Sequence, residues 1–144
     1  MKKWNKKMVI SYLVSKRLSL NLSQIELAQR YNTVFRPVDP LNQCQIAQFE
    51  TRGAPAINIF LRMMKIKNRT EVDETPVHPW KKLKEARENL RLTHEEFSKL
   101  YQKKYGQKIG KQRIAAYERA DETPGCVRFI QMVLLGGLKP FEGH

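Results

Sequence analysis

The chain has few of the residues on which disulfide-rich, zinc-binding and membrane-spanning proteins depend. Its 144 residues include two cysteines, Cys44 and Cys126, too few for a disulfide framework or a zinc site. No apolar run approaches the roughly 18 residues of a spanning helix. The longest, Phe129–Leu135, is interrupted by Gln131. The sequence therefore predicts no metal, no cofactor and no association with a membrane.

Acidic residues are also scarce. Asp and Glu total 14 against 27 Lys and Arg, which gives a formal net charge of +13. Hydrophobic residues make up 41%, enough to build a core, so disorder throughout is excluded. A strong positive charge favours a polyanionic partner, with nucleic acid ahead of an acidic membrane surface.

The N-terminal segment superficially resembles a signal peptide. Its apolar part stops after Val14, runs into Lys16 and Arg17, and has no small-residue cleavage site. We therefore expect a mature cytoplasmic protein, associated with the nucleoid if its partner is DNA.

The positive charge is concentrated in the first half of the chain. Residues 1–67 hold 12 basic and 3 acidic side chains, whereas residues 68–144 hold 15 and 11. Residues 68–79 are rich in acid, contain Pro76 and Pro79, and have little apolar material, as expected for a linker. The sequence therefore predicts an N-terminal domain over residues 1–67 and a C-terminal domain over residues 80–144.

The two halves resemble each other. Residues 22–28 align with residues 92–98 at an offset of 70, and residues 46–50 align with residues 114–118 at an offset of 68. The matched positions keep their order, and most of them are apolar or suited to helix capping. We interpret the pattern as an internal duplication.

Capping motifs predict where helices begin. Ser23 with Glu26, and Thr93 with Glu96, are capping boxes, which predict helices that start one residue after each cap. Thr123-Pro124 predicts another start, with Pro at the first helical position. Apolar residues recur at spacings of three and four, which is the helical period. The expected helices cover residues 8–19, 24–33, 42–52, 56–65, 80–89, 94–105, 110–120 and 124–135.

Each half resembles a helix-turn-helix domain of the lambda-repressor-like (XRE/Cro) family. The family pattern has an Arg in the first helix, a Leu-Thr-Gln-x-x-Leu-Ala start to the second, and an Ile-x-x-aromatic-Glu in the third. Here it is matched by Arg17, residues 22–28 and 46–50, and again by Arg87, residues 92–98 and 114–118. The connections between the second and third helices are longer than usual, similar to those of the POU-specific variant. The resemblance implies an all-α fold of two tandem helix-turn-helix domains, each with four to five helices.

The resemblance also implies which residues read DNA bases. In this motif the third helix enters the major groove, where Gln and Asn recognise adenine and Arg and Lys recognise guanine. The alternative is a solvated polar face without a ligand. The candidate base-reading residues are Asn42, Gln43, Gln45, Gln48, Lys111, Gln112 and Arg113.

A second group of residues is a candidate for phosphate contacts. The family's Gln at the start of the second helix bonds a phosphate and braces the third helix, which implies these roles for Gln24. The second half has His94 at this position. Arg17 and Arg87 are expected to form internal ion pairs with Glu50 and Glu118 instead. A basic N-terminal arm completes the phosphate-contact candidates, which are Gln24, His94, Lys2, Lys3, Lys6 and Lys7.

These features together predict a sequence-specific regulator of transcription that binds double-stranded DNA. We expect a repressor of phage or mobile-element type, in which two helix-turn-helix modules act as a pseudo-dimer within one chain. No enzyme is predicted, because the three histidines are scattered and no nucleophile–base spacing is present.

Three questions stay open on the sequence alone. One half could bind DNA and the other a protein, as in an antitoxin-like or adaptor protein. Binding could instead be directed to RNA or be non-specific, with a steep salt dependence. The apolar tail over residues 133–141 closes the core of the second half, packs one half on the other, or joins two chains in a homodimer.

Overall fold

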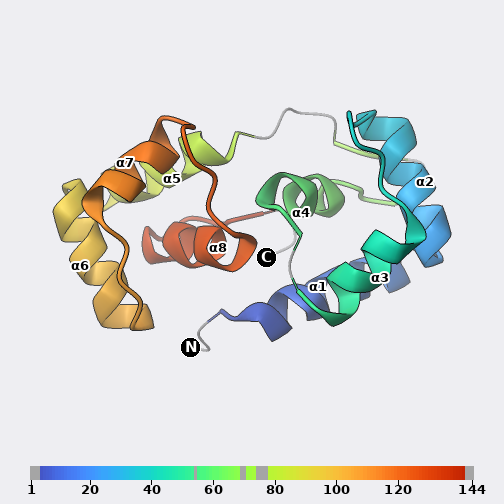
Figure 1. The fold of residues 1–144 in the computed structure, drawn as a ribbon, viewed down its shortest axis with the longest axis horizontal. Helices are drawn as coiled ribbons and strands as arrows, with labels where there is room; N and C mark the ends of the chain where they lie inside the picture. The colour runs from blue at the N-terminus through green and yellow to red at the C-terminus, as the bar shows by residue number, and fades with distance from the viewer. Residues whose placement is uncertain (1–3, 54, 69–70, 74–77, 142–144) are drawn as a thin grey trace. The chain divides into compact units, whose positions relative to one another are not determined.

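The computed structural model describes residues 4–53, 55–68, 71–73 and 78–141, and their regular secondary structure is helical (Figure 1). The predicted all-α fold class is confirmed. Eight helices lie in the described part, and all their ends fall within two residues of the predicted ones. No helix among these residues is long and apolar enough to cross a membrane. The helices are α1 (Lys6–Ser19), α2 (Gln24–Phe35), α3 (Gln43–Thr51), α4 (Ile57–Met64), α5 (Pro79–Asn89), α6 (His94–Tyr105), α7 (Lys111–Glu118) and α8 (Cys126–Leu135).

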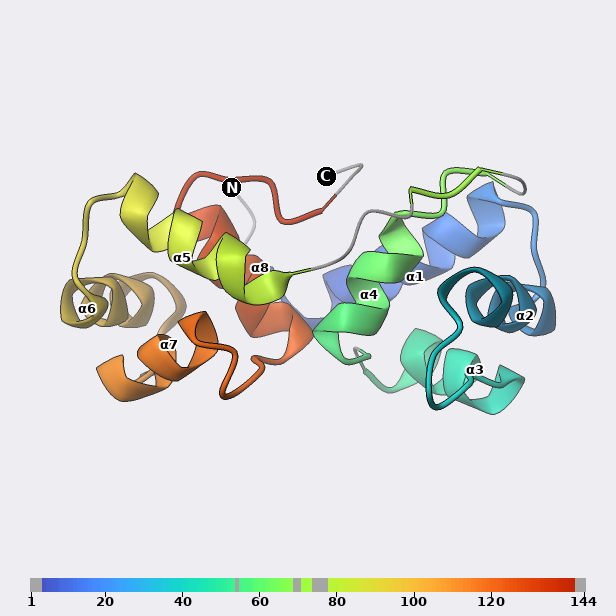
Figure 2. The same ribbon diagram turned by 90° about the horizontal axis from the view of Figure 1, so that it is seen from above.

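Contacts divide the chain into two compact units of four helices each. The N-terminal unit spans residues 5–77, and the C-terminal unit spans residues 78–141 together with Trp4. In the N-terminal unit α3 packs on both α1 and α2, as Figure 2 shows from above. In the C-terminal unit α7 packs on both α5 and α6. Each core is apolar, and its most deeply buried members include Val9, Ile46, Ile57, Phe60, Leu83, Phe97, Ile114, Phe129 and Ile130.

The second helix of each unit begins as its capping box predicts. The Ser23 side chain accepts from the Glu26 backbone N–H at 3.1 Å, and the Glu26 carboxylate accepts from the Ser23 N–H at 3.0 Å. Thr93 and Glu96 repeat the arrangement, and the backbone bond from Thr93 lowers the pKa of Glu96. These reciprocal bonds satisfy N–H groups that a helix start otherwise leaves without a partner.

Helix α1 begins earlier than predicted, and it includes two of the four lysines that were assigned to a basic N-terminal arm. The Asn5 side chain caps the helix by accepting from the Met8 N–H at 3.1 Å, so Lys6 and Lys7 lie in the first helical turn. Both lysines are exposed on the helix and do not belong to an extended arm. Lys2 and Lys3 lie outside the described residues.

The predicted start of α8 at Thr123-Pro124 is wrong. The helix begins at Cys126, its cap is Gly125, and no side chain caps it. Pro124 is buried before the helix instead of opening it. Packing of the proline ring against the core therefore takes precedence over the usual preference of proline for the first helical turn.

The C-terminal tail closes the core of its own unit. Phe141 is buried and meets the Trp4 ring edge-on, with the ring centroids 5.9 Å apart. Core closure was one of the three alternatives for this apolar segment, and it accounts for the burial of Phe141. Ile66 and Val72 form an isolated antiparallel bridge, so part of the segment predicted as a linker folds back on the residues that follow α4.

Candidate nucleic-acid interface

The third helix of each unit, α3 or α7, buries an isoleucine at the same position of the repeat. Ile46 on α3 and Ile114 on α7 are each 1% exposed, and they occupy matched positions of the repeat. Both helices are short, and α7 buries Ala116 and Tyr117 as well, so packing leaves one side of each helix towards solvent. This side carries most of the candidate base-reading residues.

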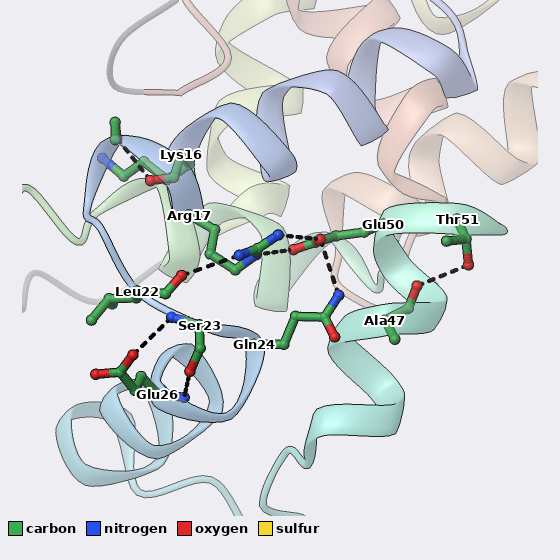
Figure 3. Close-up of polar contacts among 10 residues, drawn as sticks. Lys16, Arg17, Leu22, Ser23, Gln24, Glu26, Ala47, Glu50 and Thr51 are labelled. Carbon is green, nitrogen blue, oxygen red and sulfur yellow. Dashed lines mark hydrogen bonds and ion pairs between the residues drawn. The ribbon is translucent and has the colours of Figure 1, made fainter.

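A forked ion pair fixes α3 to α1 (Figure 3). The Arg17 Nε donates to Glu50 at 2.7 Å, and its Nη2 donates to the other carboxylate oxygen at 3.0 Å. A further bond at 3.1 Å joins Arg17 Nη1 to the Leu22 carbonyl, which lies just before α2. The hydrogen bond to Glu50 raises the pKa of Arg17 above its ordinary value. One guanidinium thus ties together three parts of the unit, as the expected internal ion pair requires.

The C-terminal unit repeats this contact. Arg87 donates to the two carboxylate oxygens of Glu118 at 2.8 and 3.0 Å and to the Leu92 carbonyl at 2.8 Å. The hydrogen bond to Glu118 raises the pKa of Arg87 as well. The sequence prediction that Arg87 pairs internally is therefore confirmed, as it is for Arg17.

Gln24 and His94 join these networks from the first position of α2 and α6. The Gln24 amide donates to Glu50 at 3.2 Å, and the His94 Nε2 lies 3.3 Å from Glu118. Both side chains therefore brace the second helix of the unit against the third. Their predicted contact with phosphate stays a prediction.

Two of the four amides at the start of α3 act as caps. The Asn42 side chain accepts from the Gln45 N–H at 2.9 Å, and the Gln45 side chain accepts from the Asn42 N–H at 3.0 Å. Gln43 and Gln48 are exposed, as is the thiol of Cys44. This capping box was not predicted, although an Asn followed three residues later by a Gln is one of its signals.

Helix α7 begins without a side-chain cap, because its N-cap residue is Gly110. The three residues that follow, Lys111, Gln112 and Arg113, are all exposed. Arg113 lies 3.9 Å from Glu122, and both side chains are at least half exposed. An ion pair of this length in water is weak, so it leaves the guanidinium available to a ligand.

The loop before each third helix is pinned at its end. Asn32 on α2 donates to the Leu41 carbonyl and accepts from the Leu41 N–H, both at 2.8 Å. In the C-terminal unit the Ser98 hydroxyl donates to the Ile109 carbonyl. Leu41 and Ile109 are buried and directly precede the N-cap residue of each helix. No sequence signal indicated these contacts, which set where α3 and α7 begin.

Comparisons with protein-family models, curated proteins and solved structures give no match for this chain. Among the described residues, no three His, Cys, Asp or Glu side chains gather as a metal site would require. The chemistry of the candidate interface is therefore that of its exposed amides and cations, which can form hydrogen bonds with base edges or phosphates.

Proposed function

We propose that the chain is a sequence-specific regulator of transcription that binds double-stranded DNA through α3 and α7. The observation that carries the proposal is the repeated framework. In each unit a short helix is braced by an Arg–Glu pair and presents exposed polar side chains from its first turn. A rigidly held helix with polar residues at its N-terminal end is what readout in the major groove requires.

The charge of the chain supports the same function. A net charge of +13 favours association with the phosphate backbone, which supplies affinity without choosing a sequence. The choice would come from the exposed residues of the two helices, among them Gln43, Gln48 and Arg113. Lys6 and Lys7, in the first turn of α1, are proposed to contact phosphate.

The resemblance to lambda-repressor-like helix-turn-helix domains belongs to this proposal. It is supported by the order of the helices, by the Arg–Glu pairs and by the two capping boxes at the starts of α2 and α6. A repressor is the simplest form of such a regulator, because blocking a promoter requires no additional surface. The two units would then act as a pseudo-dimer on one operator.

Selection of bound duplexes from a random pool tests the proposal, followed by affinity measurements on the selected site. Gln43→Ala should weaken binding by about 1–3 kcal/mol and relax the preference at one base pair. Gln29→Ala is the matched control, because Gln29 is an exposed glutamine on α2 outside α3. Lys6→Ala should instead weaken binding to all sequences alike.

Two other results would redirect the proposal. Equal affinity for selected and random DNA, with a steep salt dependence, would contradict sequence-specific binding. Unchanged operator binding after alanine substitution at all three positions 111–113 would assign the C-terminal unit to a protein partner. That second result is the one expected of an antitoxin-like or adaptor protein.

A further inference from the structure

The two third helices, α3 and α7, can be compared position by position, because the residues that hold each one in its unit are equivalent in the repeat. At an offset of 68, Ile46 matches Ile114 and Glu50 matches Glu118, so the buried anchor and the braced carboxylate are equivalent. The same offset matches Gln43 with Lys111 at the first position of each helix. Both of these side chains are exposed. They therefore occupy the same place on two copies of one scaffold.

The exposed chemistry at these matched places differs. In α3, all of whose residues are described, the only charged residue is Glu50, and it is engaged by Arg17. The exposed surface of α3 is therefore neutral and carries amides. In α7 the exposed first turn holds two cations, Lys111 and Arg113, on either side of Gln112.

The caps of the two helices add to this difference between their exposed side chains. In α3 the side chains of Asn42 and Gln45 are bonded to the backbone of the helix start, which leaves Gln43 as the exposed amide of the first turn. In α7 the cap is Gly110, so the residue matched to Gln45, which is Arg113, has no capping role. The N-terminal unit thus presents an amide where the C-terminal unit presents cations.

We propose that the two units read chemically different half-sites, an adenine-containing one by the N-terminal unit and a guanine-containing one by the C-terminal unit. The inference rests on the proposed function. An amide donates to and accepts from the adenine edge, whereas a lysine or arginine donates to the two acceptors of guanine. The operator of this chain is then asymmetric, with Gln43 and Lys111 as the paired specificity residues.

A reciprocal exchange of these two residues tests the inference in the full chain. Bound duplexes are selected from a random pool by the unmodified chain, by Gln43→Lys and by Lys111→Gln. Gln43→Lys should change the preferred base from adenine to guanine in one half-site only. Lys111→Gln should make the opposite change in the other half-site. Each exchange should alter the relative affinity for the two bases by roughly 5- to 150-fold.

Controls separate these effects from changes of charge or folding. Lys99→Gln removes the same charge from an α6 side chain that is 77% exposed, and it should leave every base preference unchanged. Circular dichroism and thermal unfolding check that each variant folds, which is expected because both exchanged residues are exposed.

The possible failures are distinguishable. If no sequence is enriched by the unmodified chain, the proposed function falls, and this inference falls with it. If an operator is enriched but its half-sites show the same base preference, or the exchanges leave them unchanged, the function stands and the inference is overturned.

Discussion

At the scale of single residues, the contact that recurs in both units is the ion pair between the first and third helices. The carboxylates of Glu50 and Glu118 are each only 7% exposed, and a buried carboxylate is costly without a partner. Each one receives two bonds from a guanidinium, whose planar fork matches the carboxylate in a way that lysine does not. The arginine in the repeat pattern therefore has a structural role.

Removing one member of such a pair should strongly destabilise the N-terminal unit. Arg17→Met keeps much of the aliphatic stem but leaves the Glu50 carboxylate buried without its guanidinium partner. We expect the free energy of unfolding to fall by about 3 kcal/mol, measured by urea denaturation.

Arg119→Met is the matched control for this experiment. Arg119 pairs with Asp121 at 2.9 Å, but both side chains are more than 60% exposed. Its loss should cost less than about 1 kcal/mol, because water screens and solvates such pairs. Similar small losses for both variants would show that Glu50 does not depend on its partner.

At this scale the ion pairs could be predicted from the sequence, whereas the side-chain bonds that fix the loop backbone could not. Arg17 and Glu50 were predicted to meet because the repeat pattern supplies both. The bonds of Asn32 to Leu41 were not predicted, because they depend on a loop path that periodicity does not describe. Similarly, four amide side chains near α3 were predicted to read DNA bases, whereas two of them, Asn42 and Gln45, cap the helix.

At the scale of whole elements, the eight helices of the described residues could be predicted from the helical period, and at α2 and α6 a capping box also fixed the first residue. The predicted starts of α1 and α8 were each two residues from the observed ones. The lysines of residues 1–7 suggested an arm, and positive charge is unfavourable in a first helical turn. Asn5 nevertheless caps α1 and places Lys6 and Lys7 in that turn. At α8, the Thr-Pro signal failed because Pro124 is buried ahead of the helix.

The packing of α8 on α5 depends on a residue without a side chain. A Cβ at Gly136 would lie 2.5 Å from the Ala86 carbonyl oxygen and 2.6 Å from its Cα, distances that real Cβ atoms do not reach. Ala86 is itself fully buried on α5. The small residues at these two positions therefore allow the close approach of the two elements.

Gly136→Ala should force α8 away from α5. We expect a loss of about 1–3 kcal/mol or more in the free energy of unfolding, because the clash is with backbone atoms that cannot rotate aside. Thermal or urea denaturation measures the loss. Gly125→Ala is the control: a Cβ there would meet nothing within 4 Å, so its cost should be limited to the loss of up to about 1 kcal/mol expected for alanine at the N-cap of α8. A neutral Gly136→Ala would contradict the close approach.

At the scale of the whole molecule, the chain departs from a simple succession of two units. Trp4 belongs to the C-terminal unit, whereas the next residue, Asn5, caps the first helix of the N-terminal unit. The Trp4 carbonyl accepts from the buried Gln131 amide at 2.8 Å, across 127 positions of sequence. The repeat gives no hint of this contact, because an interaction between distant segments has no periodic signal.

Trp4 therefore completes a polar contact as well as an apolar core. Gln131 is 8% exposed, its amide nitrogen donates to Trp4, and its oxygen accepts from the Tyr101 hydroxyl. The pKa of Tyr101 is raised by burial, in keeping with the enclosed setting of this chain of bonds. Displacing Trp4 would leave a buried amide donor without its partner, which is costly in addition to the cavity.

Trp4→Ala should for these reasons destabilise the C-terminal unit although the substitution lies at the opposite end of the chain. The expected cost is about 3–5 kcal/mol, the usual range for removing a buried large aromatic side chain. Hydrogen exchange should show faster exchange of the amides of α8, while those of α2 and α3 keep their protection. Trp80→Ala, at a half-buried tryptophan on α5, should have a smaller effect. If exchange accelerates first in α2 and α3, Trp4 stabilises the N-terminal unit, and its assignment to the C-terminal core is wrong.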